Sequence, residues 1–364
     1  WNEGERVEGI TNPLWTGIIA LGLWLGADAP ALAWALGLAS GLVLLGLTVL
    51  LARAWLPAEH RFLAPLAAAA AACSASLWYW STAGLETSFH AAWVCVALLL
   101  AARSAHGFMV VALVVTTYSR MDGVLLAAVL LGFRLLPRWR EPRAWVPGLV
   151  YGAVVALGLL ARLAYYGSLV PNTYFAKVGG TPLAFGLVYV GRFLAVGALP
   201  LLVPAVLAAL RVRGTRPAFV YVLVSFAYVA WVGGDAFRFS RFLLPVLGPL
   251  CALAVVGLAE AQRIRPGLAW LLAPSLPLAC GLFVGQEVLA GVALGLGPAW
   301  LLWGGVLWHP LPVRTGTRAA AAALAAGALA VLGVAGGPGG VREHLDGARR
   351  NSELREQWAY DGYM

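Results

Sequence analysis

The stretch SFHAAWVCVALLLAARSAHGFMVVALVVTTYSRMDGVLLAAVLLGFRLLPRWREPR, from Ser88 to Arg143, indicates the fold of this chain. Short polar links separate and follow the apolar runs within it. The first and last links, Arg103–His106 and Arg134–Arg143, are basic, whereas the middle link, Tyr118–Gly123, carries one arginine and one aspartate. Because lysine and arginine of membrane proteins stay on the cytoplasmic side, this alternation predicts a polytopic membrane protein. Its functional polar residues are expected on the arginine-poor side or inside the bundle.

The same pattern extends along the chain. A membrane crossing needs roughly 20 apolar residues to span a hydrocarbon core of about 30 Å, and we expect about twelve crossings. The apolar runs are Ala31–Leu51, Phe62–Trp80, Ser88–Ala102, Gly107–Tyr118, Gly123–Leu136, Trp145–Tyr166, Leu183–Leu210, Ala218–Trp231, Phe242–Leu258, Gly267–Val284, Val288–Trp308 and Ala319–Ala335. A shorter apolar stretch, Pro13–Gly26, is expected to be an interfacial or re-entrant helix.

The basic links support this count, because all of them fall on one side if each run crosses once. They are Arg53/His60/Arg61, Arg103/His106, Arg134–Arg143, Arg211/Arg213/Arg216, Arg263/Arg265 and Arg314/Arg318. The run Gly107–Tyr118 is short, which indicates helices that stop within the bundle around a polar cavity.

Composition agrees with a membrane protein. Hydrophobic residues make up 61% of the chain, charged residues 11%, and the mean hydropathy is +0.83, outside the range of soluble globular proteins. Most of the net charge of +9 falls in short loops, where topology explains it, so no nucleic-acid partner is expected. Cys73, Cys95, Cys251 and Cys280 form no CxxC pair and are interpreted as small buried hydrophobes.

We therefore predict an all-α, polytopic transmembrane helical bundle. Residues 1–30 are expected to be the remainder of a first external loop with its interfacial helix, residues 31–336 the transmembrane domain, and residues 337–364 the start of an external C-terminal segment or domain. The chain begins with a polar, acidic segment without an initiating Met and stops in mid-pattern, which predicts a fragment of a longer protein.

Two links on the arginine-poor side carry a carboxylate near an apolar run. Glu8 lies in an acidic segment that leads to Trp15; this segment could hold a sugar or phosphate, or be a solvated loop with an interfacial tryptophan. Glu86 could position a sugar hydroxyl or a cationic partner, or complement the dipole of the helix that follows.

Two further links combine charged, amide and aromatic groups. Arg120 and Asp122 stand at a helix break, where charges must face protein or water, and they could satisfy each other or contact a sugar or acceptor. In the next arginine-poor link, Lys177 follows Asn172 and Tyr174, and a lone lysine beside hydrogen-bonding groups suits a phosphate.

The most informative link, Gly233–Phe242, joins a flexible turn to one carboxylate, Asp235, and two arginines, Arg238 and Arg241. Residues at i and i+3 share a helix face, so the two guanidinium groups could clamp one phosphate or diphosphate. The alternative is anchoring to lipid headgroups, with Asp235 neutralising one arginine.

Five segments, taken in order, resemble the loop motifs of bacterial membrane glycosyltransferases of the GT-C superfamily. They are WNEGERVEGITNPLW (1–15), STAGLETSF (81–89), SRMDG (119–123), YYGSLVPNTYFAK (165–177) and GGDAFRFSRFLLP (233–245). They are most similar to the branch with the mycobacterial terminal arabinofuranosyltransferases. The resemblance covers residues 1 to about 245, and from there to 335 only the hydropathy agrees. It implies transfer of a sugar from a polyprenyl-phosphate donor to a glycan, lipid or protein acceptor at the outer face of the bacterial cytoplasmic membrane.

The resemblance also implies residue roles. The family's catalytic carboxylate lies in an acidic first-loop motif shortly before the segment matching GERVEG, and this motif is not in the chain. The main base is therefore expected upstream of Trp1, and the chain from Trp1 to Met364 is expected to be inactive alone. Asp235 is the substitute base if the upstream acid is missing. The remaining roles follow the resemblance: phosphate stabilisation by Arg238, Arg241 and Lys177; orientation of sugar hydroxyls, or of the arginines, by Glu86, Asn172 and Asp235; sugar, acceptor or structural contacts by Glu8, Arg120, Asp122 and Tyr174.

Two other classes stay open. A transporter or flippase for lipid-linked sugars would use the same basic cavity without a base, but it should show internal repeats, and none is visible in the sequence. A non-catalytic binder of lipid-linked sugars is the second. No cofactor is expected; the wider superfamily admits a divalent metal, but no ligand cluster in the sequence indicates one. Arabinose and hexose donors are equally compatible with these residues.

Overall fold

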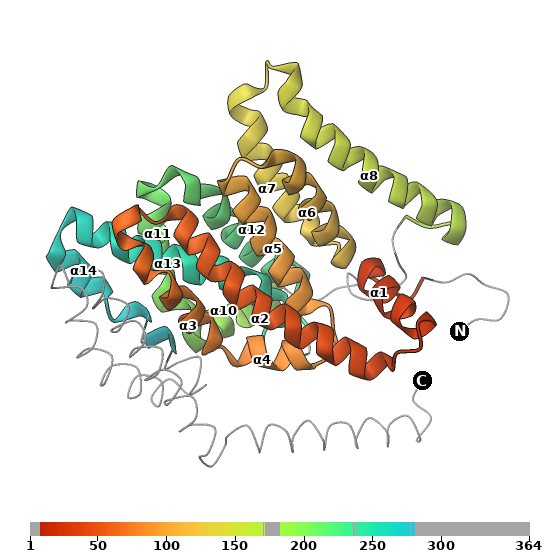
Figure 1. Cartoon of the computed structure of the whole chain (residues 1–364), viewed down its shortest axis with the longest axis horizontal. Coiled ribbons are helices and arrows are strands. Elements are labelled where there is room, and N and C mark those ends of the chain that lie inside the picture. The colour runs from red at the N-terminus through yellow and green to blue at the C-terminus, as the bar shows by residue number, and fades with distance from the viewer. Residues whose placement is uncertain are drawn as a thin grey trace, which may run out of the picture.

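The computed structural model describes residues 8–169, 171, 183–235, 237, 239–276 and 278–280. Every regular element within these residues is a helix, which confirms the predicted all-α class (Figure 1). The elements are α1 (Pro13–Trp24), α2 (Ala29–Trp55), η1 (Ala58–Leu63), α3 (Pro65–Ala72), α4 (Ala75–Thr82), α5 (Thr87–Ala102), α6 (His106–Ser119), α7 (Gly123–Leu135), η2 (Leu136–Arg138), α8 (Pro142–Tyr166), α10 (Leu183–Phe193), η3 (Leu194–Ala198), α11 (Leu199–Arg211), η4 (Arg213–Thr215), α12 (Arg216–Val232), η5 (Arg241–Leu243), α13 (Leu244–Ile264) and α14 (Pro266–Leu272).

Five helical segments in the described part are long and apolar enough to cross a membrane, or six if one bent pair counts as a span. They are Ala29–Trp55, Pro142–Tyr166, Leu183–Arg211, Arg213–Val232 and Arg241–Ile264. Helices α5, α6 and α7 are shorter, and the predicted runs Val288–Trp308 and Ala319–Ala335 lie outside the described residues. The count of about twelve crossings therefore stays a prediction.

The predicted run Phe62–Trp80 contains a break, so it is either one bent span or a re-entrant loop, and its crossing stays a prediction. The segment that ends at Ala72 and the helix α4 are bent by 67° relative to each other. Ser74, between them, has an extended backbone, and the indole Nε1 of Trp78 donates a hydrogen bond to the carbonyl oxygen of Ala72 at 2.6 Å. Because the indole satisfies a carbonyl that the helix leaves unpaired, an apolar sequence can break at this point.

The run Leu183–Leu210 is also interrupted. Gly197 lies within η3 and has a φ of 138°, a conformation open to glycine, so the helix kinks there between α10 and α11. The sequence predicted one run because its apolar composition is continuous across this glycine.

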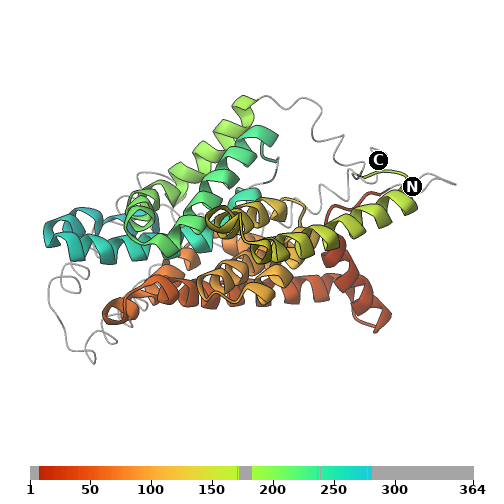
Figure 2. The same ribbon diagram turned by 90° about the horizontal axis from the view of Figure 1, so that it is seen from above.

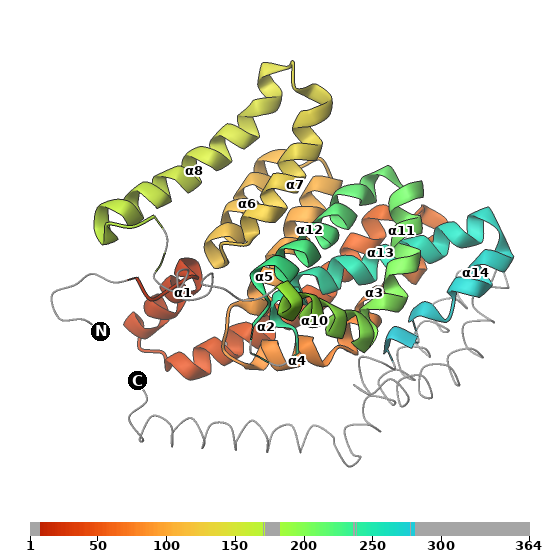
Figure 3. The same ribbon diagram turned by 180° about the vertical axis from the view of Figure 1, so that it is seen from behind.

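Helix α13 forms the centre of the bundle, and all its residues from Leu244 to Ala261 are buried. Helices α2, α3 and α5 pack on one side of it and α11 and α12 on the other, as Figures 1 and 3 show from opposite directions. The close approach of α13 to α11 requires a glycine at position 257, because a Cβ there would clash with the carbonyl oxygen of Pro204 on α11. In contrast, α8 packs mainly along α6 and α7, and its C-terminal half diverges from the other helices (Figure 1; Figure 2 gives the view from above).

Several of the basic links lie close to one another in the described part of the chain. Gly214 lies beside Trp55, and one pocket is lined by both Arg211 and Arg263. In the neighbouring pair of links, burial and the charges of Arg134 and Arg138 lower the pKa of His106. In the described part, residues 53–61, 211–216 and 260–265 are thus joined in one group, and residues 103–106 and 134–138 in another. That all basic links lie on one side stays a prediction, and Arg314 and Arg318 lie outside the described residues.

Candidate functional site

Arg120 joins three arginine-poor links in one buried ionic cluster. Its Nη1 donates to Oε1 of Glu86 at 3.0 Å, while Nε and Nη2 donate to the two carboxylate oxygens of Asp122 at 3.1 and 3.0 Å. Oε2 of Glu86 accepts from Nδ2 of Asn12 at 2.8 Å. The side chains of Arg120, Glu86 and Asp122 are 11%, 7% and 13% exposed. Arg120 and Asp122 satisfy each other, as one of the two interpretations of this link stated, and Glu86 has a cationic partner from a distant link.

Backbone geometry positions this cluster. Helix α6 ends at Ser119, and Arg120 adopts an extended conformation with φ −155° and ψ 134°. Gly123 then starts α7 so close to α6 that a Cβ there would lie 2.5 Å from the carbonyl carbon of Thr116. The glycine therefore permits the tight reversal that holds Arg120 and Asp122 between the two helices.

The charges of the cluster support one another. Burial disfavours the charged form of Arg120, but Asp122 and Glu86 outweigh it and raise the pKa of Arg120 above its ordinary value. Burial likewise favours the neutral form of Asp122, yet the guanidinium of Arg120 outweighs burial and holds the pKa of Asp122 below its usual range. Both groups are therefore charged at neutral pH.

A buried histidine extends the cluster, and the sequence interpretation did not select it. Nδ1 of His90 lies 2.8 Å from Oγ of Ser119, and Nε2 lies 3.9 Å from Oδ1 of Asp122. His90 is 1% exposed on α5. Its position one helical turn after Glu86 was the available signal, because residues four apart share a helix face.

Glu8 is also paired. Its Oε2 lies 2.8 Å from Nε of Arg162 near the end of α8, and both side chains are less than 10% exposed. This contact ties the beginning of the described chain to the last turn of α8. The sequence interpretation named Glu8 but did not identify Arg162 as its partner.

A second ionic pair lies in the most informative link. Nε of Arg241 donates to Oδ2 of Asp235 at 2.9 Å, and Oδ1 of Asp235 accepts from the hydroxyl of Tyr189 at 3.1 Å. The Tyr189 oxygen also accepts from the backbone N–H of Phe242 at 3.2 Å. Tyr189, on α10, lies inside an apolar run and was not predicted as a site residue. Both oxygens of Asp235 are engaged, which favours its role of holding an arginine over that of a base.

Aromatic rings surround the guanidinium of Arg241. Its Cζ lies 4.7 Å from the ring centroid of Phe237, 5.1 Å from that of Phe242 and 5.5 Å from that of Trp80. Cζ of Arg120 lies 4.9 Å from the centroid of the same Phe242 ring. Phe242 therefore contacts both arginines and joins the two ionic pairs into one site.

One edge of the Arg241 guanidinium, formed by its two terminal nitrogens, is available to bind a ligand. Asp235 engages Nε, and Nη1 and Nη2 have no hydrogen-bond partner among the described residues. An arginine held at Nε presents these nitrogens in the plane that suits two oxygens of a phosphate. The side chain is 12% exposed, so an anion would bind it in a largely desolvated environment.

The clamp predicted for Arg238 and Arg241 stays a prediction, because Arg238 lies outside the described residues. Phe239 and Ser240 have positive φ values of 61° and 47°, so the backbone turns just before η5 begins at Arg241. Arg238, Asn172, Tyr174 and Lys177 lie outside the described residues.

The four carboxylates gathered at this end are all paired with arginine: Glu8 with Arg162, Glu86 and Asp122 with Arg120, and Asp235 with Arg241. Over the described ranges, no group of three or more His, Cys, Asp or Glu side chains is placed to hold a metal ion.

The helices and this site define an all-helical membrane protein with a buried ionic centre at its arginine-poor end. Comparison with known proteins finds a distant relative, the terminal β-(1→2)-arabinofuranosyltransferase of Mycobacterium tuberculosis (strain ATCC 25618 / H37Rv), which is 28% identical over 217 residues. The match includes 53% of this chain and 34% of that enzyme, so the chain spans about a third of the relative's length. No family model matches the chain, and no solved structure matches it. The similarity supports a distant relationship to a glycosyltransferase.

Proposed function

We propose that this chain is the membrane part of a glycosyltransferase that moves a sugar from a polyprenyl-phosphate donor to a glycan, lipid or protein acceptor. The observation that carries the transferase class is the similarity to the arabinofuranosyltransferase over 217 residues. The ionic site supports it, because its residues come from four of the five segments that resemble glycosyltransferase loops.

In this proposal Arg241 binds the donor phosphate. Its Nε is fixed by Asp235, its ring neighbours exclude water, and Nη1 and Nη2 are open among the described residues. The phosphate gains negative charge as the sugar–oxygen bond breaks. A preorganised guanidinium therefore stabilises the transition state more than it stabilises the bound donor. Arg238 and Lys177 would add further positive charge.

Arg120 has a different role in this site. Three of its nitrogens already donate to Glu86 and Asp122, so it supports the site through Phe242 and does not take the phosphate. Glu86 and Asp122 are thus positioning residues. Asn172 and Tyr174 would contact the sugar or the acceptor.

The acceptor hydroxyl needs a base, which takes its proton while the polyprenyl phosphate leaves. The four carboxylates of the site are each held by an arginine, so we assign this task to the acidic motif that the resemblance places before Trp1. Asp235 is the substitute only if that motif is missing. Arg263 and Arg265 lie at the opposite end of α13 from Arg241, and the positive-inside rule then favours an active face outside the cytoplasmic membrane.

The test is transfer from radiolabelled polyprenyl-phosphate sugars in membranes that contain the complete gene product. Arg241→Gln should lower kcat/KM by roughly 10²–10³-fold, the usual effect of removing one such donor. Arg241→Lys keeps the charge but loses the planar fork, so it should recover only part of the rate. Arg143→Gln, in an arginine-rich link, is the matched control and should leave transfer unchanged.

Two results would contradict the proposal. If the protein moves lipid-linked sugars across the membrane without transferring them, it is a transporter. If it binds the donor but transfers nothing from any sugar, although an acid precedes Trp1 in the gene, it is a non-catalytic binder.

A further inference from the structure

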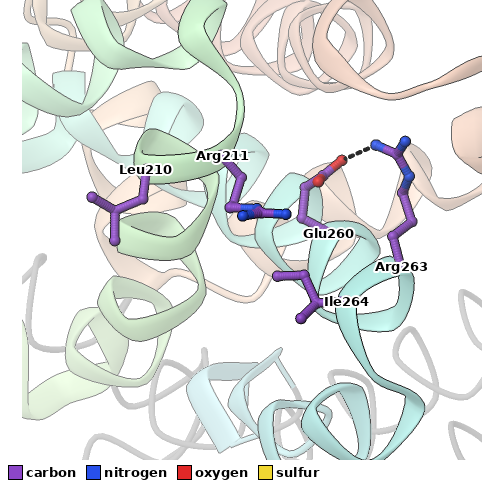
Figure 4. A pocket seen from close by; sticks show the side chains of 5 residues that line it. All are labelled: Leu210, Arg211, Glu260, Arg263 and Ile264. Atoms are coloured by element: carbon purple, nitrogen blue, oxygen red, sulfur yellow. Dashed lines mark hydrogen bonds and ion pairs between the residues drawn. The ribbon is translucent and has the colours of Figure 1, made fainter.

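A pocket of about 370 Å³ lies between the ends of α11 and α13, at the opposite end of α13 from Arg241 (Figure 4). It is lined by Leu210, Arg211, Glu260, Arg263 and Ile264. The transferase proposed above does not use these residues, and the pocket is on the arginine-rich side of the bundle.

The charges in the pocket are unequal. Glu260 is buried, and its Oε1 accepts from Nη1 of Arg263 at 2.7 Å, so these two charges offset each other. The Arg211 side chain extends toward Glu260 in Figure 4, yet Arg211 has no hydrogen-bond or ion-pair partner among the described residues. Among the described residues that line the pocket, one positive charge therefore remains without a counter-ion.

The surroundings keep this end positive. The links that include residues 53–61, 211–216 and 260–265 carry seven arginines and two glutamates. Helices α11 and α13 both end at this pocket, and each helix C-terminus contributes a partial negative charge of about half a unit. The arginines outweigh these partial charges, so an anion is attracted to the pocket.

Two apolar residues also stand at the rim of the pocket, whose exposed lining is otherwise mostly polar. Leu210 is 67% exposed and Ile264 is 44% exposed, and both stand at the last turn of a candidate membrane span. A side chain of this kind at a helix end faces the acyl region of a bilayer. A ligand that fits has a compact anionic head beside the arginine and hydrocarbon beside Leu210 and Ile264.

We propose that this pocket binds the phosphodiester headgroup of an anionic membrane lipid, with Arg211 as the principal contact. Arg263 contributes through its remaining donors while Glu260 holds it in place. Free phosphate shares the chemistry of the head but cannot use the apolar rim, so the rim selects the lipid.

The test is native mass spectrometry of the purified protein, titrated separately with phosphatidylglycerol and phosphatidylcholine. The native protein should retain phosphatidylglycerol preferentially, and Arg211→Gln should weaken that binding about tenfold, as expected for one lost charge-assisted contact. Arg143→Gln, which removes an exposed arginine from another basic link, should change it less than about twofold. Glu260→Gln should strengthen binding, because it releases Arg263.

Equal effects of Arg211→Gln and Arg143→Gln would overturn the proposal, since they would mean general attraction to a positive surface. Displacement of the lipid by excess inorganic phosphate would also overturn it, because the site would then bind the free anion. Arg211 is exposed, so its substitution should leave the fold intact; an unchanged melting temperature checks this.

Discussion

Arg241 is held by Asp235 at one edge only: Nε lies 2.9 Å from the carboxylate, and the two terminal nitrogens have no hydrogen-bond partner among the described residues. The carboxylate thus fixes the orientation of the guanidinium without occupying the edge that a phosphate needs. This arrangement separates two roles for Asp235, a base and a holder of Arg241, that the sequence left open.

Asp235→Asn distinguishes these roles. If Asp235 holds Arg241, the amide oxygen can still accept from Nε, so we expect a fall of about tenfold in kcat/KM, mostly through KM for the donor, with an unchanged pH profile. If Asp235 is the base, kcat should fall by roughly 10²–10⁴-fold and the acidic limb of the pH profile should disappear. Tyr189→Phe removes the other hydrogen bond to Asp235, and it should lower kcat/KM without changing the pH profile.

The packing of α13 gives a second prediction. Gly257→Ala places a Cβ against the carbonyl oxygen of Pro204, so α11 and α13 must move apart. We expect a loss of about 1–3 kcal/mol in the free energy of unfolding, measured in lipid or detergent. Gly132→Ala, on α7, is the control, because no atom lies within 4 Å of its added Cβ. A similar change in both variants would argue against close packing of α11 on α13.

Periodicity and charge predicted much of this fold because a bilayer imposes long apolar runs and one-sided arginines. Periodicity and charge did not predict the helix breaks at Ser74 and Gly197, because the sequence around both residues is continuously apolar. Hydropathy indicates whether a segment can lie in lipid. Whether its helix continues depends on local contacts and backbone conformation, such as the Trp78 indole and Gly197.

For the candidate site, too, the sequence predicted one part and missed another. The sequence identified the links that hold Glu86, Arg120, Asp235 and Arg241, since charges beside apolar runs must be satisfied within the protein. The sequence could not predict the ion pair between Arg120 and Glu86, because only tertiary packing brings their two links together. Tyr189 was missed because it lies within an apolar run, where its hydroxyl gives no signal in composition.

Breaking the Arg120 cluster should destabilise the protein. Arg120→Met leaves the carboxylates of Glu86 and Asp122 buried without their cation. Removing one partner of a buried ion pair costs about 3–5 kcal/mol, and we expect a loss of that size in the free energy of unfolding. Arg143→Met, at an exposed position, should change it by less than about 0.5 kcal/mol. Equal stability of the two variants would show that the cluster contributes nothing to folding.

The low pKa of Asp122 predicts the pH dependence of this stability. Arg120 holds the pKa of Asp122 below its unfolded value of about 3.9. Asp122 binds its proton less readily in the folded state, so its contribution is complete above about pH 4 and is lost as the pH falls through the folded pKa. Asp122→Asn cannot titrate, so it should be less stable than the native protein at pH 7, and the difference should shrink below about pH 4. Unfolding measured between pH 7 and pH 3 checks this, and a difference that stays constant over the range would show that the Asp122 carboxylate is not stabilised by Arg120.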